Sequence, residues 1–170
     1  DKVPHVVKID GMDMWVIDGH TFGKAGSGGT IDPDFKKFPF QESQGGPWGI
    51  NDVHPAAWDP KTRLKMMDEF GIDYQVLYPN AIGLGGQNLV NTVKDPALVL
   101  LCLQLYNDAM AEVQEDSNNR FLPMPIMPAW SIDECVREAK RCAAMGYRGV
   151  NMTSDPQDSH SPDLGRTEWD

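Results

Sequence analysis

The chain has 170 residues and a mass of 18.9 kDa, the size of one ordinary domain or of part of a larger one. Hydrophobic residues make up 41% of it and charged residues 24%, enough apolar material for a core, which excludes disorder for most of the chain. Its 25 acidic residues outnumber 15 basic ones and give a net charge of −10. Electrostatic repulsion therefore disfavours binding to nucleic acid and to anionic membrane surfaces.

The N-terminal segment and the cysteines favour a cytoplasmic protein. The start DKVPHVVKID has no apolar run behind a basic end, so we expect no signal peptide, and the longest apolar stretch, near 97–105, is too short to cross a bilayer. Cys102, Cys135 and Cys142 form no C-x-x-C pair. We expect them to be buried, reduced thiols, which suits a reducing compartment.

Residues 1–57 lack helical periodicity and form the first region that we expect. Asp10-Gly11 separates the strand-like runs VVKI and MDMWVI, and this dipeptide is the strongest short signal for a β-hairpin. Residues 23–49 are rich in glycine and have no period, which predicts a long irregular loop. The region is therefore interpreted as a hairpin with a glycine-rich loop insert.

The second expected region, residues 58–170, repeats an order of helix, glycine and strand. Asp59-Pro60 starts its first helix, because aspartate caps free N–H groups and proline suits the first helical position. Gly71 ends this helix, and a strand follows over 72–78. The helix face that we expect to be buried consists of Leu64, Met67 and Phe70.

Two further helices follow the same plan. The second begins at Asp95-Pro96 and precedes a strand over 121–127, whereas the third opens with the capping box from Ser131 to Glu134 and precedes a strand in YRGVNMTS. The faces that we expect to be buried are Leu98, Leu101, Cys102, Leu105, Ala109 and Val113 in the second helix, and Ile132, Cys135, Val136, Ala139, Cys142 and Ala143 in the third. Alternating helices and short strands predict an α/β fold with a parallel sheet.

Two short motifs have a functional and a structural interpretation. Asp18-Gly19-His20 could supply two metal ligands on one side of a strand end, but a second hairpin turn with an exposed His20 explains the same residues, and we favour the turn. The segment FGKAGSGG lacks the first glycine and the hydroxyl residue of a phosphate-binding loop. The remaining histidines, which form no H-x-H or H-E-x-x-H motif, are His5, His54 and His160.

The run AWDPKTRLKMMDEFGIDYQVLYPN, residues 57–80, resembles the amidohydrolase-related branch of the amidohydrolase superfamily, the group similar to aminocarboxymuconate-semialdehyde decarboxylase. That branch shares the pattern W/Y-D-P-x-x-R-L-x-x-M-D-x-x-G-I/V-D-x-x-V-L-Y-P. The residues matching it here are Trp58, Asp59, Pro60, Arg63, Leu64, Met67, Asp68, Gly71, Ile72, Asp73, Val76, Leu77, Tyr78 and Pro79. The likeness continues through Tyr106-Asn107-Asp108, Arg120, Pro123, Pro128, Glu138, Gly146, Gly149 and Ser154-Asp155-Pro156.

The resemblance implies a partial TIM-type (β/α)8 barrel with an N-terminal β-hairpin and a long loop insert. It implies part of a metal-dependent enzyme that hydrolyses a small organic substrate. Two alternatives stay open: a non-oxidative decarboxylase on the same scaffold, and a non-catalytic fragment that folds with a partner chain. We expect the natural protein to be longer at both ends, with the remainder of the barrel or a homo-oligomer partner completing the fold.

The resemblance also implies a divalent ion, zinc or manganese, for the complete enzyme. The usual ligands of the family align outside both ends of these residues, so we expect no tightly bound ion in this chain and assign no catalytic residue. What can be carried over are strand ends that would face the mouth of a barrel, where such enzymes bind substrate. These candidate walls of a substrate pocket are Tyr78, Asn80, Met127, Thr153, Ser154 and His160.

Overall fold

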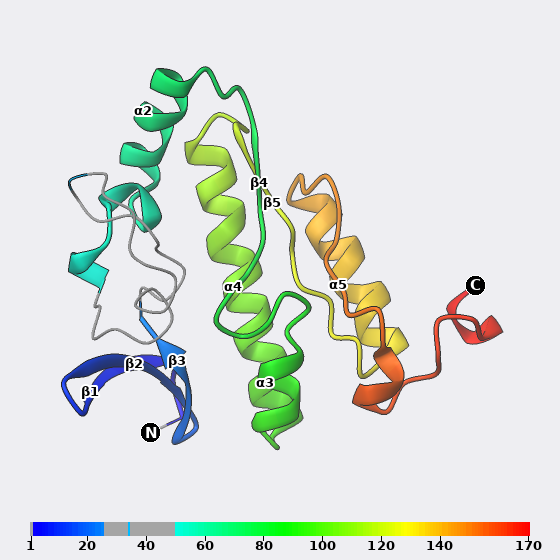
Figure 1. Ribbon diagram of the computed structural model, residues 1–170. Coiled ribbons are helices and arrows are strands. Elements are labelled where there is room, and N and C mark those ends of the chain that lie inside the picture. The colour runs from blue at the N-terminus through cyan, green and yellow to red at the C-terminus, as the bar shows by residue number, and fades with distance from the viewer. Residues whose placement is uncertain (1, 26–33, 35–49) are drawn as a thin grey trace. The chain divides into compact units, whose positions relative to one another are not determined.

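A computed structural model describes residues 2–25, 34 and 50–170 of the chain (Figure 1). The fold is mixed α/β, with a three-stranded antiparallel sheet, a two-stranded parallel sheet and several helices. The chain divides into two compact units, Asp1–Asp73 and Tyr74–Asp170. The division thus follows Asp73, whereas the sequence led us to expect it between residues 57 and 58. Most of the predicted glycine-rich loop lies outside the described residues.

The first unit contains the predicted hairpin. Its antiparallel strands are β1 (His5–Ile9), β2 (Met12–Ile17) and β3 (His20–Lys24), in that order across the sheet. Asp10 and Gly11 connect β1 to β2, and both have the positive φ that a type I′ turn requires, 49° and 80°. This hairpin prediction is confirmed.

A second tight turn connects β2 to β3. Asp18 and Gly19 have φ angles of 50° and 76°, and the flanking residues Ile17 and His20 pair across the turn. His20 is exposed. The turn interpretation of Asp18-Gly19-His20 is therefore confirmed, because the aspartate and glycine supply the positive φ angles that reverse the chain.

Helix α2 (Pro60–Phe70) begins and ends in the first unit as predicted. The Asp59 carboxylate accepts the Lys61 and Thr62 N–H groups at 3.3 and 3.0 Å, and Gly71 ends the helix with a φ of 68°. The Asp59 pKa lies below its ordinary value, chiefly because the Thr62 hydroxyl and N–H donate to the carboxylate. Two 3₁₀ helices, η1 (Ile50–Asp52) and η2 (Pro55–Ala57), precede it.

The buried face of α2 is only partly the one predicted. Met67 is buried and Leu64 half-buried, but Phe70 is 65% exposed, so its prediction as a core residue is wrong. The main contact of α2 within this unit is with η2, near its first turn. Phe70 occupies the last turn, which lies at the other end of the helix from that packing partner.

The second unit contains the parallel strands. Strand β4 (Gln75–Leu77) pairs with β5 (Phe121–Pro123), and further along the same segment Ile126 forms an isolated parallel bridge with Asn151. These strands are shorter than the predicted 72–78 and 121–127, and YRGVNMTS contributes only the bridge. Prolines 79, 123 and 125 have no N–H group to donate to a ladder, which explains the short pairing.

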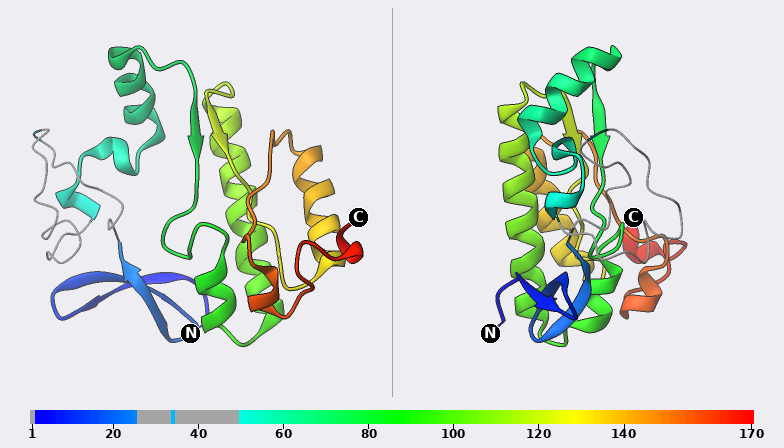
Figure 2. Two further views of the ribbon diagram at one scale, coloured as in Figure 1. Left: turned by 45° about the vertical axis from the view of Figure 1, so that its right-hand side comes forward. Right: turned by 60° about the vertical axis from the view of Figure 1, so that its left-hand side comes forward.

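Three α-helices and two 3₁₀ helices complete the second unit, and Figure 2 shows α4 and α5 running alongside the parallel strands. The elements are α3 (Gln87–Thr92), α4 (Pro96–Asp116), α5 (Ile132–Ala144), η3 (Pro156–Ser159) and η4 (Thr167–Trp169). Asp95 caps α4 and Ser131 caps α5, as predicted. The strands within residues 2–25, 34 and 50–170 form no closed barrel.

The buried face of α4 differs from the predicted one. Its buried residues are Val99, Leu103, Asn107 and Gln114, whereas Leu101 and Leu105 are 51% and 55% exposed. The first half of α4, PALVLLCLQL, is apolar on all sides, so its pattern does not specify which side is buried. The buried face also includes the polar residues Asn107 and Gln114, which a pattern of apolar residues cannot indicate.

Helix α5 shows a smaller deviation of the same kind. Cys135 and Cys142 are buried as expected, but Val136 and Ala143 are exposed, and Glu138 is buried in their place. The cysteines are free thiols, which confirms the prediction for these two, and Cys102 is half-buried. The core around them contains Met127, Cys135, Cys142 and Tyr147.

Among the helices that the structure describes, none combines the length and the apolar character needed to cross a membrane.

Candidate functional site

The loops that follow the parallel strands meet at the carboxyl edge of the second unit. A β-carbon built on Gly85 would lie 2.7 Å from the Thr153 nitrogen, and one on Gly86 would lie 2.9 Å from Cγ2 of Ile126. The Asn151 carboxamide donates a hydrogen bond to the carbonyl of Leu84. The loop after β4 is therefore packed directly onto the segment around the Asn151 bridge, and glycine is needed at both points of contact.

Four of the predicted pocket residues lie close to this junction in sequence and carry accessible polar groups. The Asn80 carbonyl accepts the Gly83 N–H at 3.0 Å, and its side chain is exposed. The hydroxyl of half-buried Thr153 accepts the Asp155 N–H at 3.1 Å, and the exposed Ser154 hydroxyl donates to the Asp155 carboxylate. His160 is exposed at the end of η3, which contacts α3.

The two remaining candidates differ sharply in exposure. Tyr78, directly after β4, is 58% exposed. Met127 is only 3% exposed and packs in the core against Cys135, Cys142 and Tyr147. Its side chain thus contacts residues of α5 and of the segment that follows it. The structure therefore assigns Met127 to core packing instead of to the wall of a cleft.

The buried carboxamide of Asn107 on α4 is not among the residues that the sequence indicated for a site. The Asn107 side chain accepts the Ile126 N–H at 2.9 Å and donates to the Ile126 carbonyl at 3.1 Å. Backbone groups alternate along a strand, and Met124 already donates to Leu77 of β4. The N–H and carbonyl of Ile126, two residues after Met124, point toward the same side of the strand segment, but β4 has already ended there. The Asn107 carboxamide therefore forms the two hydrogen bonds that a neighbouring strand would otherwise form with Ile126.

The same carboxamide holds a buried charged group. Asn107 donates to Oε1 of Glu138 at 2.7 Å, and the Arg141 guanidinium binds both Glu138 oxygens at 2.6 and 2.8 Å. Arg141 also pairs with Asp108. Burial acts to raise the Glu138 pKa, but the hydrogen bonds from Arg141 and Asn107 outweigh it and hold the pKa below its ordinary value.

The buried thiols and phenols around this network are not activated. Burial raises the pKa of Cys142 to about 12, with the Glu138 carboxylate adding to the effect, and raises the pKa of Cys135 to about 11. Burial likewise raises the pKa of Tyr106 to about 12. Because the thiolate is the nucleophilic form of cysteine, the thiols of Cys135 and Cys142 are poor nucleophiles at neutral pH.

The described side chains do not fit a divalent ion. Within residues 2–25, 34 and 50–170, no group of three or more His, Cys, Asp or Glu side chains is arranged to hold a metal. His54 illustrates the alternative use of such a residue, because its ring accepts the Ala56 N–H at 3.2 Å and caps η2. We therefore assign no reaction step to a metal ion bound by the described residues.

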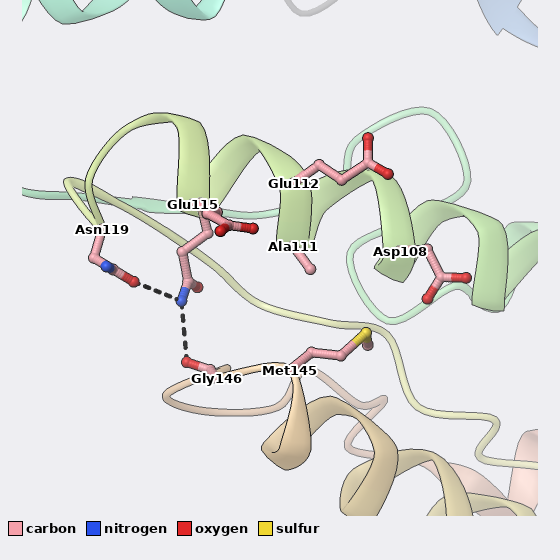
Figure 3. A pocket seen from close by; sticks show the side chains of 8 residues that line it. Asp108, Ala111, Glu112, Glu115, Asn119, Met145 and Gly146 are labelled. Carbon is pink, nitrogen blue, oxygen red and sulfur yellow. Dashed lines mark hydrogen bonds between the residues drawn. The ribbon is translucent and has the colours of Figure 1, made fainter.

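A cavity of about 610 Å³ lies at the other end of α4, near its last turns (Figure 3). Its lining combines carboxylates of α4, including Glu112 and Glu115, with Met145 and Gly146 at the end of α5. This end of the helix leads into the start of β5, so the cavity is distinct from the loops at the carboxyl edge.

No protein-family model matches the sequence. The likeness to the amidohydrolase-related branch therefore depends on the residues quoted for it, of which Asn107 and Glu138 prove to be the centre of the buried network. The sequence feature that could have indicated a role for Asn107 is its position as a polar residue on an otherwise largely apolar face of the helix. No local pattern indicated its partner, Ile126.

Proposed function

We propose that this chain is part of a metal-dependent amidohydrolase-like enzyme that hydrolyses a small organic substrate at the carboxyl edge of its parallel strands. One observation carries the proposal: the loop around Gly85 packs on Thr153, so that the segments following two parallel strands converge. In open α/β sheets and in (β/α)8 barrels, ligands bind at this edge of the strands. The family resemblance supplies the class of reaction.

The finer fold proposal is that β4, β5 and the segment of Asn151 are successive strands of an incomplete TIM-type barrel. They run parallel in chain order, and each connection between them contains a helix. Val76 of β4 is 47% exposed, and Tyr74 and Tyr78, which flank the strand at the alternating positions, are 66% and 58% exposed. Such a side of a parallel strand is normally covered, so we propose that the remainder of the barrel, or a homo-oligomer partner, covers it.

The chemistry proposed for this chain is substrate binding. The Asn80 carboxamide, the hydroxyl groups of Thr153 and Ser154 and the imidazole of His160 would hydrogen-bond polar groups of the substrate, and the Tyr78 ring would pack against its carbon skeleton. Zinc or manganese, held by residues outside this chain, would act as the Lewis acid. The catalytic groups are proposed to lie there too.

The test uses the full natural polypeptide that contains these residues, loaded with zinc or manganese. Hydrolysis of a panel of amides, lactones and esters is measured beside carbon dioxide release from aromatic and unsaturated carboxylates. Thr153→Val should lower kcat/KM by about tenfold, the value of one lost hydrogen bond. Thr167→Val, which removes a hydroxyl from an exposed residue of η4, is the control and should change kcat/KM by less than about twofold.

Each outcome has a defined meaning. Carbon dioxide release without hydrolysis would favour the decarboxylase alternative. If Thr153→Val and Thr167→Val changed kcat/KM equally, the substrate would not bind at the carboxyl edge. A metal-loaded protein without either activity would leave the fragment that folds with a partner chain as the better interpretation.

A further inference from the structure

Helix α4 holds the strand segment 121–127 at two points, one near each end of the segment. Near the amino end, the Ser117 hydroxyl accepts the Phe121 N–H at 3.0 Å. Near the carboxyl end, the Asn107 carboxamide binds both the N–H and the carbonyl of Ile126, at 2.9 and 3.1 Å. Asn107 is 0% exposed and Ser117 is 2% exposed. Two buried polar side chains on α4 and at its C-cap therefore fix the same segment at opposite ends.

The anchor at Ile126 adjoins the carboxyl edge. A β-carbon built on Gly86 would lie 2.9 Å from Cγ2 of Ile126, so this side chain is in direct contact with the loop after β4. On either side of Ile126, Pro125 accepts the Asn151 N–H at 2.8 Å and Met127 donates its N–H to the Asn151 carbonyl at 2.9 Å. The loop after β4 and the segment of the Asn151 bridge therefore meet the strand segment at the same place.

A buried carboxylate engages the second proton of the Asn107 amide. Nδ2 of Asn107 donates to Oε1 of Glu138 at 2.7 Å, and Glu138 is 2% exposed. The Arg141 guanidinium binds both oxygens of Glu138 and keeps this carboxylate in its ionised form, which only accepts hydrogen bonds. Both protons and the oxygen of the Asn107 amide are thus engaged, and the side chain is held in one orientation.

Such a fixed orientation matters where small displacements change binding. A displacement of about 1 Å at a substrate site can lower a rate by about a hundredfold, so functional sites are supported by side chains whose own positions are locked by hydrogen bonds. Ile126 is 0% exposed and does not reach a substrate itself. Its position is instead passed on through Gly86, which it contacts, and through the Asn151 bridge, two residues before Thr153.

We propose that Asn107, held by Glu138, is a positioning residue for the substrate-binding carboxyl edge. It fixes Ile126, against which Gly86 packs, and so sets the spacing between the loop after β4 and Thr153. Asn107 and Glu138 are buried and act without touching the substrate. The inference rests on the proposed function where activity is measured, but the order of the edge itself is measurable without a substrate.

The experiment compares Asn107→Ala with Ser117→Ala in the full natural polypeptide loaded with zinc or manganese. Both variants remove a buried polar side chain that binds the backbone of the same segment, but only the first anchor adjoins the carboxyl edge. Asn107→Ala should raise KM by about tenfold, the value of one lost hydrogen bond to the substrate, whereas Ser117→Ala should change KM by less than about twofold. A loss of folded protein alone lowers the apparent kcat and leaves KM unchanged, so KM separates positioning from stability.

Amide hydrogen exchange, followed by nuclear magnetic resonance, gives a readout that needs no substrate. The N–H groups of Gly86 and Asn151 are hydrogen-bonded at 3.0 and 2.8 Å, so their exchange reports local opening of the edge. In Asn107→Ala, both should exchange about tenfold faster relative to amides in the middle of α4, which report opening of the whole unit. In Ser117→Ala, this ratio should stay within about twofold of the wild type.

A pair of variants at position 138 tests the carboxylate and leaves Asn107 in place. Glu138→Gln keeps an oxygen that can accept from Nδ2 of Asn107, whereas Glu138→Leu has no acceptor. We expect Glu138→Gln to hold KM and the exchange ratio of Gly86 within about threefold of the wild type, and Glu138→Leu to change both by about tenfold. The same pair decides the proposal if Asn107→Ala does not fold.

Three results would overturn the proposal. Unchanged KM and exchange ratios in folded Asn107→Ala would mean that the carboxamide does not set the edge. Equal changes in Asn107→Ala and Ser117→Ala would mean that both side chains only stabilise the fold. Equal changes in Glu138→Gln and Glu138→Leu would show that the hydrogen bond from Asn107 to Glu138 is not the cause. A wild-type protein without activity would refute the proposed function alone, and the exchange ratios would still decide whether Asn107 positions the edge.

Discussion

The antiparallel and the parallel sheet of the described residues are specified by different kinds of contact. In the antiparallel sheet, β1 and β2 are joined by a two-residue turn, so pairing partners such as Ile9 and Met12 are near neighbours in the chain. In the parallel sheet, Gln75 pairs with Phe121 across the whole of α3 and α4. The first sheet therefore depends on turn residues, whereas the second depends on buried side chains that bring distant segments together.

The largest expected effect tests the contact between α4 and the strand segment. Asn107→Leu would leave the Ile126 N–H and carbonyl buried without their partner, and each such group costs about 1–3 kcal/mol. We expect the free energy of unfolding, measured by urea denaturation, to fall by about 2–6 kcal/mol. Asn88→Leu, at an exposed position of α3, is the control. A similar loss in both variants would mean that the carboxamide contact is unimportant.

The second prediction sharpens which side of α4 is buried. Leu103 is fully buried and Leu105 is 55% exposed on the same helix. Leu103→Ala should lower the free energy of unfolding by about 2–5 kcal/mol through lost contacts and a residual cavity. Leu105→Ala should change it by less than about 0.5 kcal/mol, as is typical of surface positions. A larger loss in Leu105→Ala than in Leu103→Ala would mean that the face predicted from apolar periodicity is the buried one. Urea denaturation of the two variants decides between these results.

The third prediction concerns the turn between β1 and β2 of the antiparallel sheet. Gly11 has a φ of 80° and open space around the position of a β-carbon, so Gly11→Ala changes only the conformational energy. We expect a loss of about 1–2 kcal/mol, measured as thermal stability of the first unit. Gly11→Asn is the control and should lose less, because asparagine tolerates the left-handed conformation. Equal losses would show that the turn conformation is not the cause.

This contrast explains what the sequence could predict. Helix starts at Asp59, Asp95 and Ser131 and the turn at Asp10 are confirmed because caps and turns act within a few residues. The buried side of α4, the exposure of Phe70 and the core position of Met127 depend on what packs there from elsewhere. The amino-acid pattern of a single helix or strand does not indicate which distant segments pack against it.

The candidate site shows the same limit. The sequence and the family likeness pointed to strand ends, and the structure brings the segment of Gly85 against Thr153 at such an edge. The burial of Gln114 could not be predicted, because its amide nitrogen donates to Asn119 and to the carbonyl of Gly146, which lies 32 residues further along the chain.

The smallest expected effect is the pH dependence that Glu138 confers. Its folded-state pKa lies below the ordinary value of 4.5, because the hydrogen bonds from Arg141 and Asn107 outweigh burial. The unfolded chain therefore takes up a proton first as the pH falls. The contribution of Glu138 to stability is complete above the unfolded pKa and is lost as the pH falls through the folded one.

Glu138→Gln removes the titrating group, so its free energy of unfolding should change less steeply with pH below about 4.5 than that of the wild type. Urea denaturation at a series of acidic pH values gives the slopes. The control is Glu168→Gln, which changes an exposed carboxylate of the same unit and should keep the wild-type slope. An unchanged slope in Glu138→Gln would mean that other carboxylates carry the acid sensitivity. The buried network would then stabilise the parallel sheet through geometry alone, without a measurable dependence on charge.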